Sequence, residues 1–324
     1  MKILIILPNW LGDAIMATPA IELLARHYPN ARFTFVGSYV SIEALKHHPL
    51  CERAIVDETK QAPSRMLATY KLAKELGEFS LAITFRNQIH SSLLLRFTKT
   101  VVCLAKSSWH SKLLLSHTPK IKTDQHLVMQ YSELAMINCD DFDGMSPPLK
   151  LYIKENKFEK SSLGINAGAT YGSAKRWYPE RFAEVGAAFH KEYNIIIFGG
   201  PNEIEMAKDI ENNLLSLGVN NYVNLAGKTS VEELCANIGA CELFVTNDSG
   251  PMHVAAAYQV PTVAIFGPTK YKETSQWKNG KSKIVRKEME CSPCMKRECP
   301  LGHHECMKNI TSTEVIEALK ILQN

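Results

Sequence analysis

Short apolar segments alternate with segments of helical spacing along most of this chain. In its second half the apolar segments are 163–166, 195–198 and 262–266, and the segments with helical spacing are 180–193, 203–217 and 231–238. Each of these apolar segments runs into a turn that contains glycine. Short strands joined by helices form parallel sheets that are covered on both faces. The second half is therefore predicted to be an α/β domain with polar loops at the carboxyl ends of its strands.

The first half of the chain repeats this pattern. An apolar strand at 2–7 is followed by a polar turn at 8–13 and a helix to about Arg26, and further strands are expected at 32–36, 54–56, 81–85 and 101–104. A length of 324 residues fits about two domains. The pair Pro147-Pro148 and the polar run after it indicate the joint. We therefore expect two Rossmann-like domains, at 1–155 and 156–324, with parallel sheets that face each other across a cleft.

The segment 245–257 has the pattern of a strand end, a polar turn and a helix. Asp248 and Ser249 are residue types that cap helices, Gly250 lets backbone approach a ligand, and Pro251 suits the first helical position. The free N–H groups and the positive dipole end at such a turn can hold a phosphate. A capped helix that binds nothing has the same pattern, so the turn alone does not separate the two interpretations.

Composition places the chain among ordinary soluble globular proteins, with 45% hydrophobic and 22% charged residues. The apolar run that begins at Lys2 is too short for the core of a signal peptide and is broken by Pro8. The sequence has no run of about 18 apolar residues, the length that a membrane span needs. We therefore expect a cytoplasmic protein.

The net charge of +4 is modest but unevenly distributed. The stretch 79–123 contains no Asp or Glu, and its basic residues are Arg86, Arg96, Lys99, Lys106, Lys112, Lys120 and Lys122. This acid-free stretch predicts a positive face that binds a phosphorylated lipid headgroup, a membrane surface or nucleic acid. Nucleic acid is disfavoured, because no recognition-helix, zinc-finger or RNP pattern accompanies the charge. A solvated basic face that binds nothing is the alternative.

Four motifs occur in order along nearly the whole chain. They are Gly12-Asp13 with Thr18-Pro19, Ala174-Lys175-Arg176-Trp177 with Pro179, the run from Asn247 to His253, and Phe266-Gly267-Pro268-Thr269. Each is common by itself, but together they resemble the ADP-heptose:lipopolysaccharide heptosyltransferases. The cysteine-rich run 291–307 further resembles the branch of that family that adds the second heptose of the inner core.

The resemblance implies an α/β enzyme of the GT-B glycosyltransferase fold, in which the C-terminal domain binds a nucleotide-sugar and the N-terminal domain binds the acceptor. The implied reaction is inverting transfer of L-glycero-D-manno-heptose from ADP-heptose to the heptose I–Kdo–lipid A core, at the inner face of the cytoplasmic membrane. That acceptor is strongly anionic, so the positive face of the acid-free stretch would attract it. The alternatives are transfer to Kdo, a nucleotide-sugar epimerase of the same fold, and a non-enzymatic nucleotide-binding protein.

Asp13 is the expected general base, because the reaction needs a carboxylate that accepts the proton of the attacking hydroxyl. The resemblance supports this role, and a helix N-cap is the alternative. Trp10 and Gly12 in the same turn, with Arg86 and Asn87 at the start of the acid-free stretch, are expected to bind the acceptor.

Lys175 is expected to stabilise the negative charge that grows on the leaving diphosphate, because a transferase without a metal must supply positive charge from side chains and helix N-termini. The resemblance assigns Asp248 to donor hydroxyls and places Glu203 near the nucleotide ribose. A helix start that contacts no ligand is the alternative for Glu203, and core packing is the alternative for His253. The expected donor-binding residues are Thr170, Lys175, Glu203, Asp248, Ser249, Gly250 and His253.

Two patterns concern metal ions. Residues 140–143 contain a DxD spacing, which holds a divalent metal in the other major glycosyltransferase fold. Their place near the predicted joint favours a polar turn instead. Enough soft ligands for a structural zinc ion are provided by Cys291, Cys294, Cys299 and Cys306, although their spacings match no recognised finger. No cofactor is expected to be required for the reaction.

Overall fold

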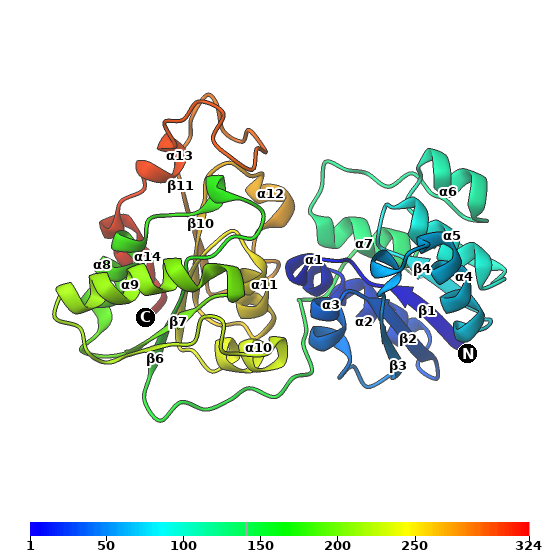
Figure 1. The fold of residues 1–324 in the computed structure, drawn as a ribbon, viewed down its shortest axis with the longest axis horizontal. Coiled ribbons are helices and arrows are strands. Elements are labelled where there is room, and N and C mark those ends of the chain that lie inside the picture. The colour runs from blue at the N-terminus through cyan, green and yellow to red at the C-terminus, as the bar shows by residue number, and fades with distance from the viewer. Residues whose placement is uncertain (140–141, 324) are drawn as a thin grey trace. The chain divides into compact units, whose positions relative to one another are not determined.

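The chain forms two compact units in a computed structural model that describes residues 1–139 and 142–323. The first unit is Met1–Tyr152 and the second begins at Ile153, close to the boundary that we predicted after residue 155. In Figure 1 the first unit runs from blue to green and the second from green to red. Asp141, which begins the DxD spacing, lies outside the described residues together with Asp140.

The N-terminal unit is built on a five-stranded parallel sheet with strand order β3-β2-β1-β4-β5. Its strands are β1 Lys2–Ile6, β2 Arg32–Gly37, β3 Cys51–Val56, β4 Leu81–Thr84 and β5 Val102–Ala105. All of β4 and all but the first residue of β1 and β2 are buried, which is why these strands are mostly apolar and do not alternate between exposed and buried residues.

Helices connect the strands of this sheet. They are α1 Leu11–Met16, α2 Thr18–His27, α3 Tyr39–Leu45, α4 Arg65–Leu76, α5 Ile89–Phe97, α6 Trp109–Leu114 and α7 Leu127–Ala135, with a short 3₁₀ turn η1 at Thr59–Gln61. Helices α4 and α5 pack on the sheet face that carries Leu4 and Ile6. The single helix predicted to about Arg26 is divided at Ala17, where Thr18 begins α2.

The C-terminal unit is built on a six-stranded parallel sheet with strand order β11-β10-β9-β6-β7-β8. Its strands are β6 Ser162–Asn166, β7 Asn194–Phe198, β8 Tyr222–Asn224, β9 Leu243–Asn247, β10 Thr262–Phe266 and β11 Ser282–Arg286. No strand was predicted at β8 or β11. Both are edge strands with half-exposed or exposed residues, so they lack the apolar run that marks the central strands.

Helices cover both faces of this second sheet. They are α8 Pro179–Phe189, α9 Ile204–Ser216, α10 Val231–Gly239, α11 Gly250–Ala257, α12 Tyr271–Thr274, α13 Glu305–Lys308 and α14 Ser312–Gln323, with 3₁₀ turns η2 Ser173–Lys175 and η3 Pro201–Glu203. The face that carries Ile165 and Ile197 packs against α8, α9 and α14. Met252 of α11 packs in a different cluster with Phe266. Trp177 is buried in the first of these clusters.

Each sheet has one point where the direction of strand succession reverses. In the N-terminal sheet it lies between β1 and β4, and in the C-terminal sheet it lies between β6 and β9. Ligands of open parallel sheets bind outside the carboxyl ends of the strands at such a point, because the connecting loops diverge there. A ligand site is therefore expected at this point in each unit.

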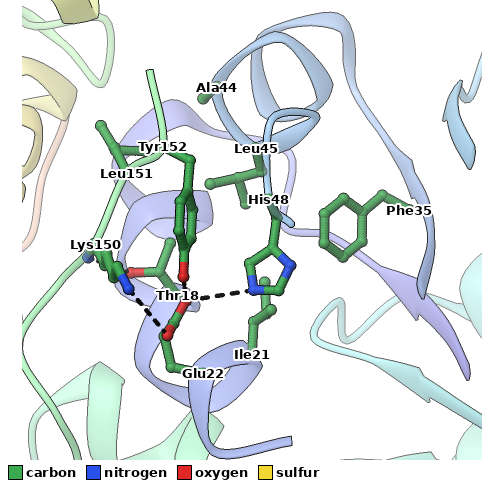
Figure 2. A pocket seen from close by; sticks show the side chains of 10 residues that line it. All are labelled: Thr18, Ile21, Glu22, Phe35, Ala44, Leu45, His48, Lys150, Leu151 and Tyr152. Carbon is green, nitrogen blue, oxygen red and sulfur yellow. Dashed lines mark hydrogen bonds and ion pairs between the residues drawn. The ribbon is translucent and has the colours of Figure 1, made fainter. Parts of the chain in front are cut away.

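A buried carboxylate attaches the end of the N-terminal unit to α2 (Figure 2). Glu22 accepts a hydrogen bond from the Tyr152 hydroxyl at 2.9 Å and lies 3.3 Å from His48 Nε2 and 3.6 Å from Lys150 Nζ. The Lys150 backbone N–H donates to Thr18 Oγ1 at 3.0 Å. Burial alone would raise the pKa of Glu22, but the contacts with His48, Tyr152 and Lys150 outweigh it, so the pKa is lowered.

We expect Glu22→Gln to lower the free energy of unfolding at pH 7 by about 1–3 kcal/mol, because a charged acceptor of buried hydrogen bonds is lost. The folded-state pKa of Glu22 is lowered. Its contribution is therefore present above the ordinary Glu pKa of about 4.3 and is lost as the pH falls through the lower folded value. Denaturant titrations at pH 7 and about pH 3 should show the deficit at the higher pH and a smaller one at the lower pH.

Glu52→Gln is the control for this experiment, because Glu52 pairs with Arg32 on the surface. Exposed pairs contribute little, about 0–1 kcal/mol. If both variants lost the same free energy at pH 7, the Glu22 cluster would have no special role in stability.

Candidate active site

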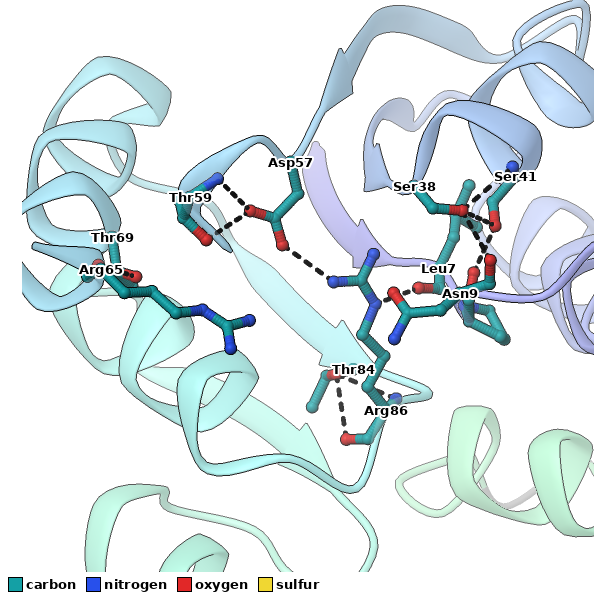
Figure 3. A network of polar contacts seen from close by, with 11 residues as sticks. Leu7, Asn9, Ser38, Ser41, Asp57, Thr59, Arg65, Thr69, Thr84 and Arg86 are labelled. Atoms are coloured by element: carbon teal, nitrogen blue, oxygen red, sulfur yellow. Dashed lines mark hydrogen bonds and ion pairs between the residues drawn. The ribbon is translucent and has the colours of Figure 1, made fainter. Parts of the chain in front are cut away.

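The turn between β1 and α1 lies at the reversal point of the N-terminal sheet and is held by the start of α3 (Figure 3). Ser38 Oγ donates to the carbonyl of Asn9 at 2.7 Å, and Ser41 Oγ donates to the carbonyl of Pro8. Trp10 occupies the N-cap position of α1 and its side chain is exposed. The backbone of this turn is therefore fixed by side chains from the neighbouring β2–α3 connection.

Asp13 is the third residue of α1 and is half-buried. The N-cap of this helix is Trp10, so the interpretation of Asp13 as an N-cap is wrong. Its carboxylate lies near Tyr131 of α7: burial raises the pKa of Tyr131 well above its usual range, and the negative charge of Asp13 raises it further. The helix dipole favours the charged form of a carboxylate in the first turn of a helix. A charged carboxylate can accept a proton when a substrate hydroxyl lies within hydrogen-bond reach of it.

Arg86 follows β4 and links the carboxyl ends of three strands. Its Nε donates to the carbonyl of Leu7 at 2.6 Å and its Nη1 donates to Asp57 Oδ2 at 2.9 Å (Figure 3). The Arg86 side chain is 5% exposed and that of Asp57 is 10% exposed. Burial would raise the pKa of Asp57, but the hydrogen bonds from Thr59 and the charge of Arg86 lower it below its usual value.

The turn between β9 and α11 lies at the reversal point of the C-terminal sheet. Ser249 is the N-cap of α11, Gly250 is its first residue and Pro251 is its second. The Ser249 side chain makes no capping hydrogen bond. It contacts Asn166 Nδ2 at 3.3 Å and Thr246 Oγ1 at 3.2 Å instead. The N-terminal backbone of α11 is therefore not capped by this side chain and is suited to an anion.

Lys175 and Asp248 form an ion pair beside this helix terminus. Lys175 Nζ donates to Asp248 Oδ2 at 2.6 Å and to the Asp248 carbonyl at 3.3 Å, and the two side chains are 13% and 5% exposed. Thr269 Oγ1 donates to the same Oδ2 at 2.6 Å. The ammonium also lies 4.8 Å from the centre of the Tyr171 ring. A lysine has three N–H donors, so these two hydrogen bonds leave one for a ligand.

Glu203 lies at the carboxyl ends of the neighbouring strands. Its Oε2 accepts a hydrogen bond from the backbone N–H of Gly200 at 2.8 Å at the start of α9. Gly168, which follows β6, is directly beneath this carboxylate, because a Cβ at that position would come within 2.0 Å of Glu203 Cδ. The glycine therefore allows the carboxylate to lie over the β6 loop, next to the terminus of α11.

The sequence matches glycosyltransferase family 9 (heptosyltransferase) over residues 69–305. The chain belongs to glycosyltransferase family 9. A curated relative, lipooligosaccharide heptosyltransferase 2 of Campylobacter jejuni, is 39% identical to this glycosyltransferase over 99% of both chains. Lipopolysaccharide heptosyltransferase 2 of Escherichia coli K12 is 27% identical, over 99% of this chain and 98% of the relative.

The solved structure of E. coli ADP-heptose lps heptosyltransferase II superimposes on this glycosyltransferase with a TM-score of 0.83 and 26% identity, over 99% of this chain and 98% of that one. The predicted fold class, α/β with two Rossmann-like parallel sheets of the GT-B type, is therefore confirmed. The expectation of an enzyme of the glycosyltransferase class is confirmed as well.

Only some of the predicted donor residues of the glycosyltransferase come together. Lys175, Asp248, Ser249 and Gly250 come together at the start of α11. Glu203 lies over the adjacent loop, and Thr170 is exposed further along that loop. His253 is buried within α11, at 3% exposure. Lys175 and Asp248 were predicted to have separate roles, but in the structure their side chains form an ion pair.

The predicted acceptor residues lie at the reversal point of the N-terminal sheet. Trp10 is exposed and Gly12 is buried in α1. Asn87 is exposed directly after Arg86. Arg86 was also counted in an exposed basic face, and this part of the interpretation is wrong. The side chain is buried, and Asp57, from outside the acid-free stretch, balances its charge.

Several polar side chains that build the donor-side turn were not among the predicted site residues. Thr269 bonds to Asp248, Asn166 bonds to the carbonyl of Gly168 and to Ser249, and Asn247 Oδ1 accepts from the backbone N–H of Trp177. Each lies at or just after the carboxyl end of β6, β9 or β10. Polar residues that end apolar strands were the available signal for them.

The rest of the acid-free stretch carries a surface of mixed character. Trp109 and Leu113 are 73% and 79% exposed and are four residues apart on α6, with Lys112 exposed beside them. Residues four apart lie on the same side of a helix, so α6 presents apolar and basic groups together. Among the helices that the structure describes, none has the length and apolar character of a membrane span.

The four cysteines of the C-terminal run line one pocket together with His303 and His304. Backbone N–H groups, with that of His304 first among them, lower the pKa of Cys299, whereas burial raises the pKa of Cys306 to about 11. Within the described part of the chain, no three His, Cys, Asp or Glu side chains are arranged as a set that could hold a metal ion. The zinc site therefore stays a prediction, which metal analysis of the purified protein would test.

Proposed function

We propose that this enzyme transfers L-glycero-D-manno-heptose, with inversion, from ADP-heptose to the heptose I–Kdo–lipid A inner core. The observation that carries the proposal is the Lys175–Asp248 pair at the terminus of α11, at the reversal point of the C-terminal sheet. Such a place suits the diphosphate of a nucleotide-sugar. The full-length similarity to proteins named heptosyltransferase 2 supports the donor and the acceptor.

In the proposed reaction Asp13 accepts the proton of an acceptor hydroxyl. The hydroxyl oxygen forms a bond to the anomeric carbon as the bond from that carbon to the diphosphate oxygen breaks. Attack on the face opposite the leaving group inverts the configuration. The turn that leads into α1, the helix of Asp13, is held by Ser38 and Ser41. The backbone before the base therefore needs little reorganisation when the acceptor binds.

ADP leaves with negative charge on its terminal phosphate. We assign the stabilisation of that charge to the remaining N–H donor of Lys175 and to the backbone N–H groups at the start of α11. Asp248 then has the role of holding Lys175 in place, in addition to accepting donor hydroxyls. No metal ion is required in this scheme, because the lysine and the helix terminus supply the positive charge.

ADP release in the presence of defined acceptors tests the proposed function. We expect release from ADP-heptose that depends on an acceptor with a first heptose and that continues in EDTA. Release with a heptose-free Kdo acceptor instead would identify transfer to Kdo. The formation of an epimerised nucleotide-sugar without acceptor would point to an epimerase, and no ADP release with either acceptor would reject transfer.

We also propose that the protein works at the inner face of the cytoplasmic membrane, where its lipid-linked acceptor lies. The exposed Trp109 and Leu113 of α6, with Lys112 between them, support a peripheral contact with an anionic surface. The contact predicts co-sedimentation with anionic vesicles that weakens in Trp109→Ala. Equal sedimentation with neutral and anionic vesicles would exclude the electrostatic part of this contact.

High salt should weaken acceptor binding more than donor binding. The exposed basic residues of the acid-free stretch are Arg96, Lys99, Lys112, Lys120 and Lys122. Charges on the surface are screened over about 8 Å at physiological ionic strength and about 3 Å at 1 M salt. The KM for the acceptor should therefore rise with salt, while the KM for ADP-heptose, which meets the shielded Lys175, should change little. Equal salt dependence of both constants would contradict an electrostatic acceptor surface.

A further inference from the structure

Three buried nitrogen atoms at the carboxyl end of the N-terminal sheet have no hydrogen-bond partner within the described residues. They are Nη2 of Arg86, Nε of Arg65 and Nδ1 of His90. Arg86 follows β4, Arg65 is the first residue of α4 and His90 is the second residue of α5. Native proteins leave few buried polar atoms unpaired, and such a group calls for an explanation. Three of them on protonatable side chains from adjacent elements suggest a shared ligand.

The three side chains are close enough for their charges to interact. Burial lowers the pKa of Arg86, Asp57 partly restores it, and the charge of Arg65 lowers it again. Burial also lowers the pKa of His90, and Arg65 lowers it further. Figure 3 shows the Arg65 side chain extending from α4 toward the region of the Arg86 guanidinium. With Asp57 negative and both arginines positive, the group has an excess of positive charge.

The Arg86 guanidinium is fixed before any ligand binds. Its Nε and Nη1 are held by the Leu7 carbonyl and by Asp57, and the side chain is 5% exposed. The unpaired Nη2 therefore points in a set direction. Guanidinium groups bind carboxylates and phosphates through their planar N–H groups, and a fixed one loses little entropy on binding.

We propose that Arg65, Arg86 and His90 bind one oxyanion of the acceptor, either a phosphate or a carboxylate. This inference rests on the proposed function, in which the acceptor carries both kinds of group. The oxyanion site lies beside β4, and β4 and β1 flank the reversal point where the Asp13 turn begins. An anion held there would fix the acceptor relative to the base.

The alternative is that Arg86 only holds the carboxyl ends of the strands together through the Leu7 carbonyl and Asp57. In that case Arg65 has no role in binding the acceptor. Arg65→Gln separates the two ideas, because Arg65 makes no contact with the Leu7 carbonyl or with Asp57 through a hydrogen bond in the described structure. Lys71→Gln is the matched control, since Lys71 lies on the same helix, is exposed and carries the same charge.

The first measurement is steady-state kinetics. We expect Arg65→Gln to raise the KM for the acceptor by about 10- to 100-fold, the worth of a charge-assisted hydrogen bond. The KM for ADP-heptose and kcat should change less than about threefold, and Arg65→Lys should be intermediate because it keeps the charge but loses the planar group. An Arg65→Gln enzyme that behaves like Lys71→Gln would overturn the oxyanion site while leaving the proposed transfer intact.

The second measurement does not depend on turnover. With ADP at saturation to fill the donor site, inorganic phosphate should raise the melting temperature of the wild type above that in NaCl of equal ionic strength. The rise should be absent in Arg65→Gln and present in Lys71→Gln. Equal melting temperatures in phosphate and NaCl for the wild type would also overturn the proposal.

Acceptors that differ in one group identify the oxyanion. If the effect of Arg65→Gln on the acceptor KM disappears with an acceptor whose phosphates have been removed, the site binds phosphate. If the effect persists with that acceptor, the site binds a sugar carboxylate. Failure of the wild type to release ADP with any acceptor would reject the proposed function, but the phosphate-dependent melting would still test the site.

Discussion

Asp13→Asn should reduce kcat by about 10²- to 10⁴-fold, the usual contribution of a general base. The substitution keeps the size of the side chain and removes its ability to accept a proton. Donor affinity should be unchanged, because the proposed donor residues belong to the C-terminal unit, whereas Asp13 lies in α1. Single-turnover rates and ADP binding, measured on the same preparation, would separate the chemical step from binding.

The position of Asp13 in the helix sets the expected effect on stability. Since Trp10 and not Asp13 is the N-cap, the variant loses no capping bond from this side chain. It does lose the favourable interaction of a negative charge with the first turn, about 0.3–1 kcal/mol. Asp124→Asn, at an exposed site in the same unit, is the control for the loss of one charge. A stable Asp13→Asn enzyme with near wild-type kcat would mean that another group accepts the proton.

The central strands could be predicted because consecutive residues in the sequence carry the signal for them. Strands such as β1 and β7 are buried along nearly their whole length, and four or five consecutive apolar residues mark them in the sequence. The edge strand β11 has one neighbour and only partly buried residues, so no continuous apolar run marks it. The division between α1 and α2 was also missed, because the apolar pattern continues across Ala17.

The site residues could be predicted as types but not as partners. The turn after β9 and the one after β1 carry the polar residues that parallel strands place at their carboxyl ends. The pairing of Lys175 with Asp248 joins residues 73 positions apart, and that of Arg86 with Asp57 joins residues 29 positions apart. No periodicity records such contacts. From the sequence alone Lys175 and Arg86 are predicted to be unpaired charges. In the structure each of them has a carboxylate partner.

That pairing decides what Lys175→Met should do. We expect kcat to fall by about 10²- to 10³-fold, because a preorganised charge at the developing anion is removed. Asp248, 5% exposed, would be left without its cation. The loss of one partner from a buried pair costs about 3–5 kcal/mol of stability. Lys208→Met, at an exposed position of α9, is the control for the loss of one lysine.

The double variant Lys175→Met/Asp248→Asn distinguishes the two effects. Removing the carboxylate charge should restore most of the stability, because no unpaired buried ion remains, but kcat should stay low, because the phosphate still lacks its cation. If the double variant recovered both stability and turnover, the fall in kcat would have come from the stranded Asp248 carboxylate repelling the diphosphate. Lys175 would then serve to neutralise Asp248 in the donor site, and the N-terminus of α11 would be left to stabilise the leaving group.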